Sequence, residues 1–305
     1  MQSGTVASNG IELFYESRGP ENGEAIVFVM GLSAQMVFWP ESLLDSLVER
    51  GYRVIRFDNR DVGKSSRIRR RLKHGPLTAI MRGYIGLSVD APYTLHDMVD
   101  DTVGLLDALA IDKAHLVGAS MGGMISQLMA GKYPERVLSL SSIMSSNNSR
   151  LVPPPKPEAL KALVAPRVKI ETEDQFVAFG LEMMGKLAGT LPQGRDELAD
   201  IYRQCWARGI NPLGIRNQFL GIVATGALTP WLKKITCPTT VIHGGADPLI
   251  RPAGGKASAR HIRGAKLAIL PGMGHDFPPS LLQRMGELIA ETAGRANSVG
   301  QPAVA

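Results

Sequence analysis

Ser120 stands where the chain changes from one repeating pattern to another. Before it, residues 115–119 form a short, mostly apolar run that favours a strand buried on both faces. After it, apolar residues recur at helical spacing, at Met121, Ile125, Leu128 and Met129. The glycines at 118 and 122 remove side chains that would collide at such a sharp corner. The sequence therefore predicts a hydroxyl exposed at a strand-to-helix turn, facing the first N–H groups of a helix.

A serine hydroxyl is a weak nucleophile, so it needs a base within reach and an acceptor that orients the base. Among six histidines, His275 alone lies on a glycine-flanked loop just after a predicted strand, residues 266–270. Sites in open α/β sheets lie at the carboxyl ends of the strands, so His275 is the candidate base. The other histidines occupy positions typical of packing, turns or surfaces: His74, His96, His115, His243 and His261.

The candidate acid is Asp247, in the loop that follows the predicted strand 239–243 and 28 residues before His275. The loop after the preceding predicted strand, residues 145–149, contains no carboxylate. Asp276 is adjacent to His275 and is expected to point away from it. A nucleophile, a base and an orienting carboxylate are therefore all present, each next to the end of a predicted strand.

These motifs resemble the α/β-hydrolase family. Its nucleophile elbow has the pattern Gly-x-Ser-x-Gly between a strand and a helix, and its catalytic residues follow in the order serine, acid, histidine. The order Ser120, Asp247, His275 matches that pattern. The resemblance covers most of residues 5–292 and implies nucleophilic attack by the serine through an acyl-enzyme.

The resemblance also implies an oxyanion hole formed by the backbone N–H groups of Met121 and Leu32. Family members often have His-Gly where this chain has Met30-Gly31, but a backbone donor does not depend on that side chain. Residues 31–35 together with 56–61 look most like bacterial carboxylesterases related to aclacinomycin methylesterase.

The sequence predicts eight short strands, the first two joined in a hairpin by Asn9-Gly10 and most of the others separated by helices. This pattern predicts the α/β class, with a mostly parallel central sheet flanked by helices. The alternation stops at the Ser/Asn/Pro-rich segment 145–157, and only helical patterns follow until about residue 229. We therefore expect an α/β-hydrolase core in residues 1–144 and 230–292, with a helical cap inserted at 145–229. Residues 293–305 lack periodicity and are expected to be disordered.

The loop 58–65 ends in Gly63-Lys64-Ser65, which resembles the end of a phosphate-binding loop. The glycine required five residues earlier is replaced by Asp58, so nucleotide binding is not expected. The loop instead looks like the Asp-x-Arg-Gly-x-Gly-x-Ser turn of the α/β-hydrolases, with Asp61 in place of the first glycine. We interpret it as a structural turn.

Composition limits the other possibilities. The chain has 305 residues, 44% apolar content and two cysteines in no motif, so we expect no metal site and no cofactor. Neither a signal peptide nor a membrane-spanning run is visible, which favours a cytoplasmic protein. The net charge of +6 equals the six cations within residues 64–73, and no nucleic-acid motif accompanies them. A homo-oligomer is compatible with the sequence.

The leading hypothesis is a serine hydrolase that cleaves small-molecule carboxylic esters with an apolar part. The same residues could serve a metal-free haloperoxidase (perhydrolase) or a carbon–carbon bond hydrolase. A non-catalytic small-molecule receptor on this scaffold is a third hypothesis.

Overall fold

The computed structural model describes residues 1–73, 76–164 and 169–299, and it contains one eight-stranded sheet. The strand order is β1-β2-β4-β3-β5-β6-β7-β8. The bounds are β1 Gln2–Ser8, β2 Ile11–Arg18, β3 Ala25–Val29, β4 Arg53–Phe57, β5 Ala114–Ala119, β6 Val137–Ile143, β7 Thr239–Gly244 and β8 Lys266–Leu270. All eight predicted strands are confirmed, and the sheet is parallel from β4 to β8.

The first two strands form an antiparallel hairpin, and β2 also pairs antiparallel with β4. Asn9 and Gly10 make the turn with φ values of 48° and 76°, as the Asn-Gly pair predicts. The sheet is therefore mostly parallel, as expected, with its antiparallel part at the N-terminal edge.

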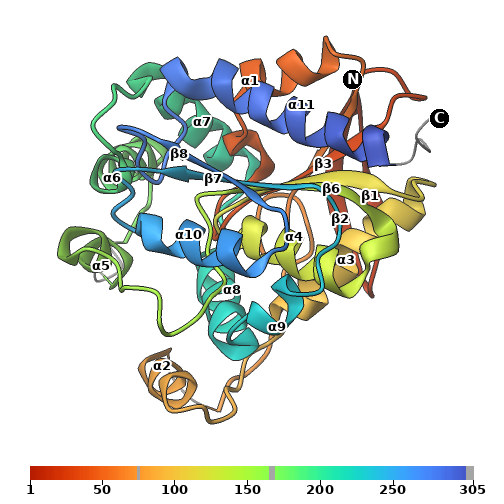
Figure 1. Ribbon diagram of the computed structural model, residues 1–305. Helices are drawn as coiled ribbons and strands as arrows, with labels where there is room; N and C mark the ends of the chain where they lie inside the picture. Colours follow the sequence, from red (N-terminus) through yellow and green to blue (C-terminus); the bar gives the residue numbers. More distant parts are fainter. Residues whose placement is uncertain (74–75, 165–168, 300–305) are drawn as a thin grey trace, which may run out of the picture.

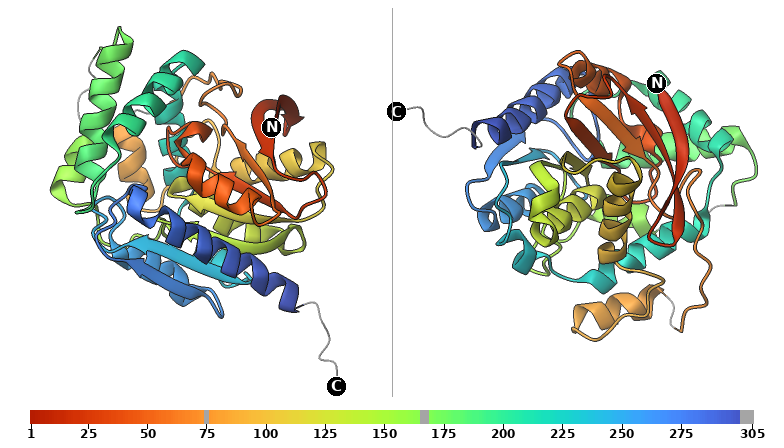
Figure 2. Two further views of the ribbon diagram at one scale, coloured as in Figure 1. Left: turned by 90° about the horizontal axis from the view of Figure 1, so that it is seen from above. Right: turned by 90° about the vertical axis from the view of Figure 1, so that its right-hand side faces the viewer.

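Helices cover both faces of the sheet (Figures 1 and 2). On one face, α1 (Glu41–Val48) packs against α11 (Leu282–Val299), and on the other α3 (Leu95–Ala108) packs against α4 (Met121–Lys132). Strand β3 shows why both faces are apolar. Val27 and Val29 join the core under α3 and α4, whereas Ile26 and Phe28 join the core under α1 and α11. Successive side chains of this buried strand therefore pack alternately into the hydrophobic cores on the two faces of the sheet.

Helices α5 to α9 lie between β6 and β7 in the chain. Their bounds are α5 Pro157–Val164, α6 Glu173–Leu187, α7 Arg195–Arg208, α8 Pro212–Thr225 and α9 Thr229–Leu232. We call α5 to α8 the inserted helices. The four helices predicted in this segment are confirmed to within a few residues. The division into a core and a cap at 145–229 stays a prediction, and residues 165–168 within it lie outside the described part.

Two segments differ from expectation. The sequence of residues 67–90, basic and interrupted by Gly75-Pro76 and Gly83, indicates an irregular segment. Residues 76–84 instead form helix α2 (Pro76–Tyr84), because Pro76 begins the helix and does not break it. The predicted disordered tail 293–305 is wrong for residues 293–299, which continue α11. Thr292 Oγ1 donates to Thr240 Oγ1 at 2.6 Å, and Arg295 Nη2 donates to the Thr239 carbonyl at 2.9 Å, so contacts with β7 hold this end. Residues 300–305 lie outside the described part.

The remaining regular elements are α10 (Pro252–His261) and three short 3₁₀ helices, Met36–Phe38, Pro134–Arg136 and Pro279–Leu281. None of the helices in the described ranges combines the length and apolar character needed to traverse a bilayer.

Candidate active site

Ser120 lies between the end of β5 and the start of α4, at the predicted corner. Its backbone has φ 55° and ψ −119°, a region that residues with a side chain rarely adopt. A Cβ at position 118 would lie 2.3 Å from the Gly122 carbonyl oxygen, and one at 122 would lie 1.9 Å from the Val29 carbonyl oxygen. Glycine at both positions is therefore a packing requirement, as the sequence predicted.

The structure brings Ser120, His275 and Asp247 together from three loops. His275 Nε2 lies 3.0 Å from Ser120 Oγ, and His275 Nδ1 lies 2.8 Å from Asp247 Oδ2. Asp247 Oδ1 accepts hydrogen bonds from the backbone N–H groups of Leu249 and Ile250 at 2.8 and 2.9 Å. Because a carboxylate only accepts, the tautomer that satisfies both contacts carries its proton on Nδ1 and leaves Nε2 facing the hydroxyl.

The neighbouring carboxylate, Asp276, turns away from His275 as expected. Its Oδ1 accepts the Gly274 N–H at 2.9 Å, and its Oδ2 accepts an N–H of Gln193 at 3.2 Å. Burial raises the pKa of Asp276 above its usual value. The Asp276 side chain therefore stabilises the loop that carries His275. The same loop is held by a hydrogen bond from the backbone N–H of His275 to the Leu187 carbonyl, at 2.8 Å.

A second histidine, His243, lies beside the acid and is fully buried. Its Nε2 lies 2.6 Å from the Ile250 carbonyl oxygen and 3.6 Å from Asp247 Oδ2. Burial lowers the pKa of His243, which favours the neutral ring at neutral pH. With Nε2 protonated, this ring donates to the Ile250 carbonyl and packs against the loop that holds Asp247.

The loop predicted to supply the oxyanion donor lies directly against Ser120. A Cβ built on Gly31 would lie 3.0 Å from Ser120 Cβ, and the next residue in the chain is Leu32. Met121 is the first residue of α4, so its N–H has no acceptor within the helix. Across the described ranges neither N–H has a hydrogen-bond acceptor, so both donors are available to bind another group.

Three side chains that sequence reasoning did not single out hold this loop. Asn59 Nδ2 donates to the Met30 carbonyl at 2.9 Å, and Asp58 Oδ1 accepts the Met36 N–H at 2.9 Å. Between them, Gln218 Oε1 from α8 accepts the Ser33 N–H at 2.8 Å. The Asp and Asn of loop 58–65 were visible as polar residues after a strand, but no local pattern marks Gln218.

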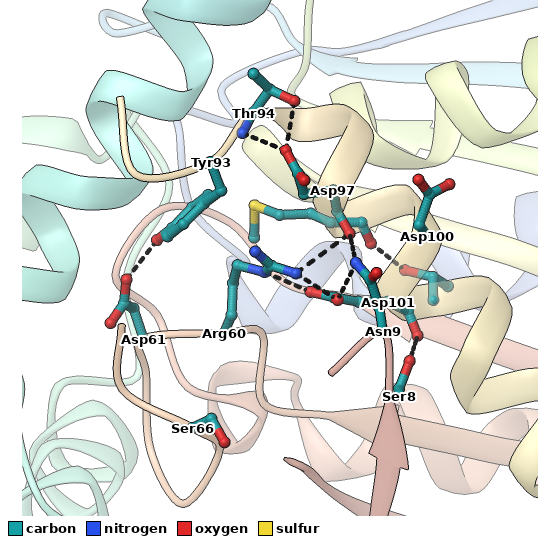
Figure 3. Close-up of polar contacts among 12 residues, drawn as sticks. Ser8, Asn9, Arg60, Asp61, Ser66, Tyr93, Thr94, Asp97, Asp100 and Asp101 are labelled. Carbon is teal, nitrogen blue, oxygen red and sulfur yellow. Dashed lines mark hydrogen bonds and ion pairs between the residues drawn. The ribbon is translucent and has the colours of Figure 1, made fainter. Parts of the chain in front are cut away.

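Side chains of the loop 58–65 are bonded to residues outside it, in and just before α3. Figure 3 shows the guanidinium of Arg60 bound to Asp101. Its Nε donates to Oδ2 and its Nη2 donates to Oδ1, each at 2.6 Å. Tyr93 Oη donates to Asp61 Oδ2 at 2.7 Å, and the Tyr93 ring lies 4.8 Å from the Arg60 guanidinium carbon. Asp61 has φ 72°, so the residue that replaces the family glycine keeps a glycine-like backbone conformation.

The inserted helices are joined to this turn by buried polar contacts. Arg208, at the end of α7, pairs with Asp58 and donates through Nε to Gln35 at 2.8 Å. Asn217 of α8 donates to Asp61 Oδ2 at 3.0 Å. Helices α7 and α8 are therefore fixed to the segments that flank the candidate site.

Comparisons with known proteins agree with this architecture. The model of the family described as the alpha/beta hydrolase fold matches residues 24–278. The curated relatives include "Putative carbamate hydrolase RutD" of Variovorax paradoxus, 26% identical, with 95% of this chain and 99% of that protein covered. They also include rhodomycin D methylesterase DnrP of Streptomyces peucetius, 25% identical, with 91% and 93% covered.

Among solved structures, the meta-cleavage product hydrolase CumD of Pseudomonas fluorescens IP01 has a TM-score of 0.70 and 20% identity. The match covers 96% of this chain and 98% of that one. At this identity the likeness concerns the fold. Because the family match spans most of the chain and both strand order and helix placement agree with it, the chain belongs to the α/β-hydrolase family.

Proposed function

We propose that the protein is a serine hydrolase that cleaves carboxylic esters through an acyl-enzyme. The observation that carries this proposal is the continuous chain of contacts from Ser120 Oγ through the His275 ring to Asp247, at 3.0 and 2.8 Å. A hydroxyl, an imidazole and a buried carboxylate in this order are the arrangement that activates a serine nucleophile.

In the proposed reaction, His275 Nε2 takes the proton of Ser120 as Oγ attacks the ester carbonyl carbon. Asp247 holds the imidazolium that forms, and the N–H groups of Leu32 and Met121 bind the oxyanion of the tetrahedral intermediate. His275 then gives its proton to the departing alcohol. Water, deprotonated by the same ring, attacks the acyl-enzyme and releases the acid, which returns Ser120 to its starting state.

The ester class is supported by the resemblance to carboxylesterases and by the methylesterase relative, which spans nearly the whole chain. In this proposal, residues 145–229 act as a cap over the site. Apolar side chains of this segment, such as Phe176 and Trp206, favour a small-molecule substrate with an apolar part.

The test is a matched set of variants assayed with p-nitrophenyl acyl esters and with a fluorophosphonate label. Ser120→Ala is expected to fold, to be inert and to escape labelling. Asp247→Asn is expected to lower kcat by about 10⁴-fold, because the orienting acceptor is lost. Asp276→Asn is the control, since it alters the other carboxylate beside His275 and is expected to keep activity within a few-fold. Substantial turnover by Ser120→Ala would overturn the proposal.

The same assays separate the competing hypotheses. Peroxide-dependent bromination and dienoate cleavage are measured beside ester hydrolysis, and the reaction with the highest kcat/KM identifies the chemistry of the site. A receptor without catalytic activity would not be labelled at Ser120.

A further inference from the structure

We call residues 30–36, which follow β3, the oxyanion loop. It contains a strained residue next to Leu32, whose N–H is the candidate donor. Ser33, which follows Leu32, has φ 61°, a left-handed conformation that is strained for a residue with a side chain. The Ser33 N–H belongs to the peptide that directly follows Leu32, so a shift of Ser33 out of this strained conformation would also displace the Leu32 backbone. The position of the Leu32 N–H therefore depends on whatever holds the Ser33 N–H in place.

Gln218 supplies that constraint from a distant part of the chain. Its side-chain oxygen accepts the Ser33 N–H at 2.8 Å, and its side-chain nitrogen donates to the Arg60 carbonyl at 2.9 Å. Because one end of the amide must accept and the other must donate, its orientation is fixed. The side chain has 0% exposure, so water does not compete for either bond.

Arg60 and the backbone next to Gln218 are both held by further hydrogen bonds. Arg60 is anchored by its two bonds to buried Asp101, which belongs to α3. On the other side, Asn217, the residue before Gln218, binds Asp61 and the Ile68 carbonyl, each at 3.0 Å. Helix α8 is thus locked to the turn shown in Figure 3, and Gln218 transmits that position to the oxyanion loop.

The neighbouring anchors of the loop come from a different source. Asn59 and Asp58, which hold the carbonyl of Met30 and the N–H of Met36, belong to the same turn as Arg60, and Asp58 also pairs with Arg208 at the end of α7. The Ser33 N–H, in the middle of the loop, is bound by a side chain of the inserted helices. The Met30 end of the loop is therefore held by the turn, the Met36 end by the turn together with α7, and the centre by α8.

We propose that Gln218 is a positioning residue that aims the Leu32 N–H at the oxyanion, so that the oxyanion hole is complete only when α8 is seated. This inference rests on the proposed ester hydrolysis by Ser120. Gln218 does not touch the substrate in this proposal. It acts through Ser33, and its loss leaves the hydroxyl, His275 and Asp247 in place.

The primary variant is Gln218→Met, which keeps the length of the side chain and removes both hydrogen bonds. Loss of an oxyanion donor typically lowers kcat by about 10²–10³-fold, so a misdirected donor is expected to lower kcat by roughly 10–100-fold with KM changed little. Gln218→Glu keeps the oxygen that accepts from Ser33 and is expected to recover most of that loss. If Gln218→Met does not fold, Gln218→Asn replaces it, because its amide is too short to reach Ser33.

The matched control is Gln127→Met. It makes the same substitution at a second fully buried glutamine, in α4, whose side-chain nitrogen donates to Ser142 Oγ at 2.7 Å and whose side-chain oxygen accepts from Ser258 Oγ at 3.4 Å, and neither partner belongs to the oxyanion loop or to α8. Its thermal stability is expected to fall about as much as that of Gln218→Met, while its kcat stays within about threefold of the parent value. Equal losses of kcat in the two variants would mean that the effect is structural and would overturn the inference.

The inhibition constant of a transition-state analogue does not change when a variant merely loses stability. A trifluoromethyl ketone adds to Ser120 and places an oxyanion in the hole, so its Ki is expected to rise in Gln218→Met by the same factor as kcat falls. Ki and kcat unchanged from the parent would refute the role of Gln218 while leaving the ester hydrolase intact. Failure of the parent protein to hydrolyse esters or to bind the ketone would instead refute the proposed function itself.

Discussion

Arg208→Met would remove the cation that faces a fully buried carboxylate. Asp58 Oδ2 contacts Arg208 Nη2 and accepts the Lys64 N–H at 3.0 Å, and its Oδ1 accepts the Met36 N–H at 2.9 Å. Asp58 has 0% exposure. Burial raises its pKa above the usual value, and Arg208 opposes that shift. Without the guanidinium, a charge would remain in this site with two backbone donors as its partners.

The expected cost is large for a single substitution. Breaking a buried ion pair by removing one partner costs about 3–5 kcal/mol, because the remaining charge is uncompensated. With an unfolding entropy of about 2.1 cal/mol/K per residue, a chain of this length loses about 0.6 kcal/mol per degree near its midpoint. We therefore expect Arg208→Met to lower Tm by about 5–8 °C.

The cost is also expected to depend on pH. Burial already places the folded-state pKa of Asp58 above its unfolded value, and loss of Arg208 raises it further. The folded state then binds a proton more readily than the unfolded chain, so stability falls as pH rises from the unfolded pKa through the folded pKa. The difference in stability between the parent and Arg208→Met should be larger at pH 7 than at pH 4.

Thermal and urea unfolding at the two pH values test this reasoning. Arg203→Met is the control, since Arg203 lies on the same helix and pairs with Asp200 at 2.5 Å with about half of its side chain exposed. Such a surface pair contributes about 0–1 kcal/mol, and its loss should be nearly independent of pH. The double variant Arg208→Met, Asp58→Asn should regain stability at pH 7. A loss below about 1 kcal/mol for Arg208→Met, with no pH dependence, would refute the assignment of a buried charge at Asp58.

Two further predictions concern packing. Gly122→Ala should prevent folding or lower Tm severely, because its Cβ would lie 1.9 Å from the Val29 carbonyl oxygen. Gly185→Ala in α6 is the control, since its Cβ would have nothing within 4 Å, and it should be neutral or stabilising by about 0.5–1 kcal/mol. Melting curves that do not separate the two variants would contradict this prediction. Truncation after Glu291 removes the bonds of Thr292 and Arg295 to β7, so it should destabilise the protein by about 2 kcal/mol or more relative to truncation after Val299. Equal urea midpoints for the two truncations would count against an anchored C-terminal helix.

The strands and the corner at Ser120 could be predicted because each depends on local sequence. Buried parallel strands appear as short apolar runs, and the corner is marked by the change of period and by Gly118 and Gly122. The approach of His275 and Asp247 to Ser120 also followed from local positions, because the carboxyl ends of parallel strands meet at one edge of the sheet.

Long-range pairs are the part that the sequence could not supply. Arg208 meets Asp58 across 150 residues, and Gln218 meets Ser33 across 185. Their side chains carry no periodic signal, and an Arg or Gln on a predicted helix is most often exposed. The end of α11 was missed for a related reason. Its last turns are specified by contacts of Thr292 and Arg295 with β7, and helical periodicity contributes little there.

The substitution of Asp61 for the family glycine marks where the inserted helices attach. A glycine there would adopt φ 72° without strain, so an aspartate is retained at some backbone cost. Its carboxylate offsets that cost by accepting hydrogen bonds from Tyr93 at 2.7 Å, from the Ile68 N–H at 2.7 Å and from Asn217 at 3.0 Å. A glycine could make none of the three. Asp61, the one position at which the turn departs from the family pattern, is therefore also the position that binds α8, the helix that carries Gln218. This departure in the sequence indicates the contact with α8.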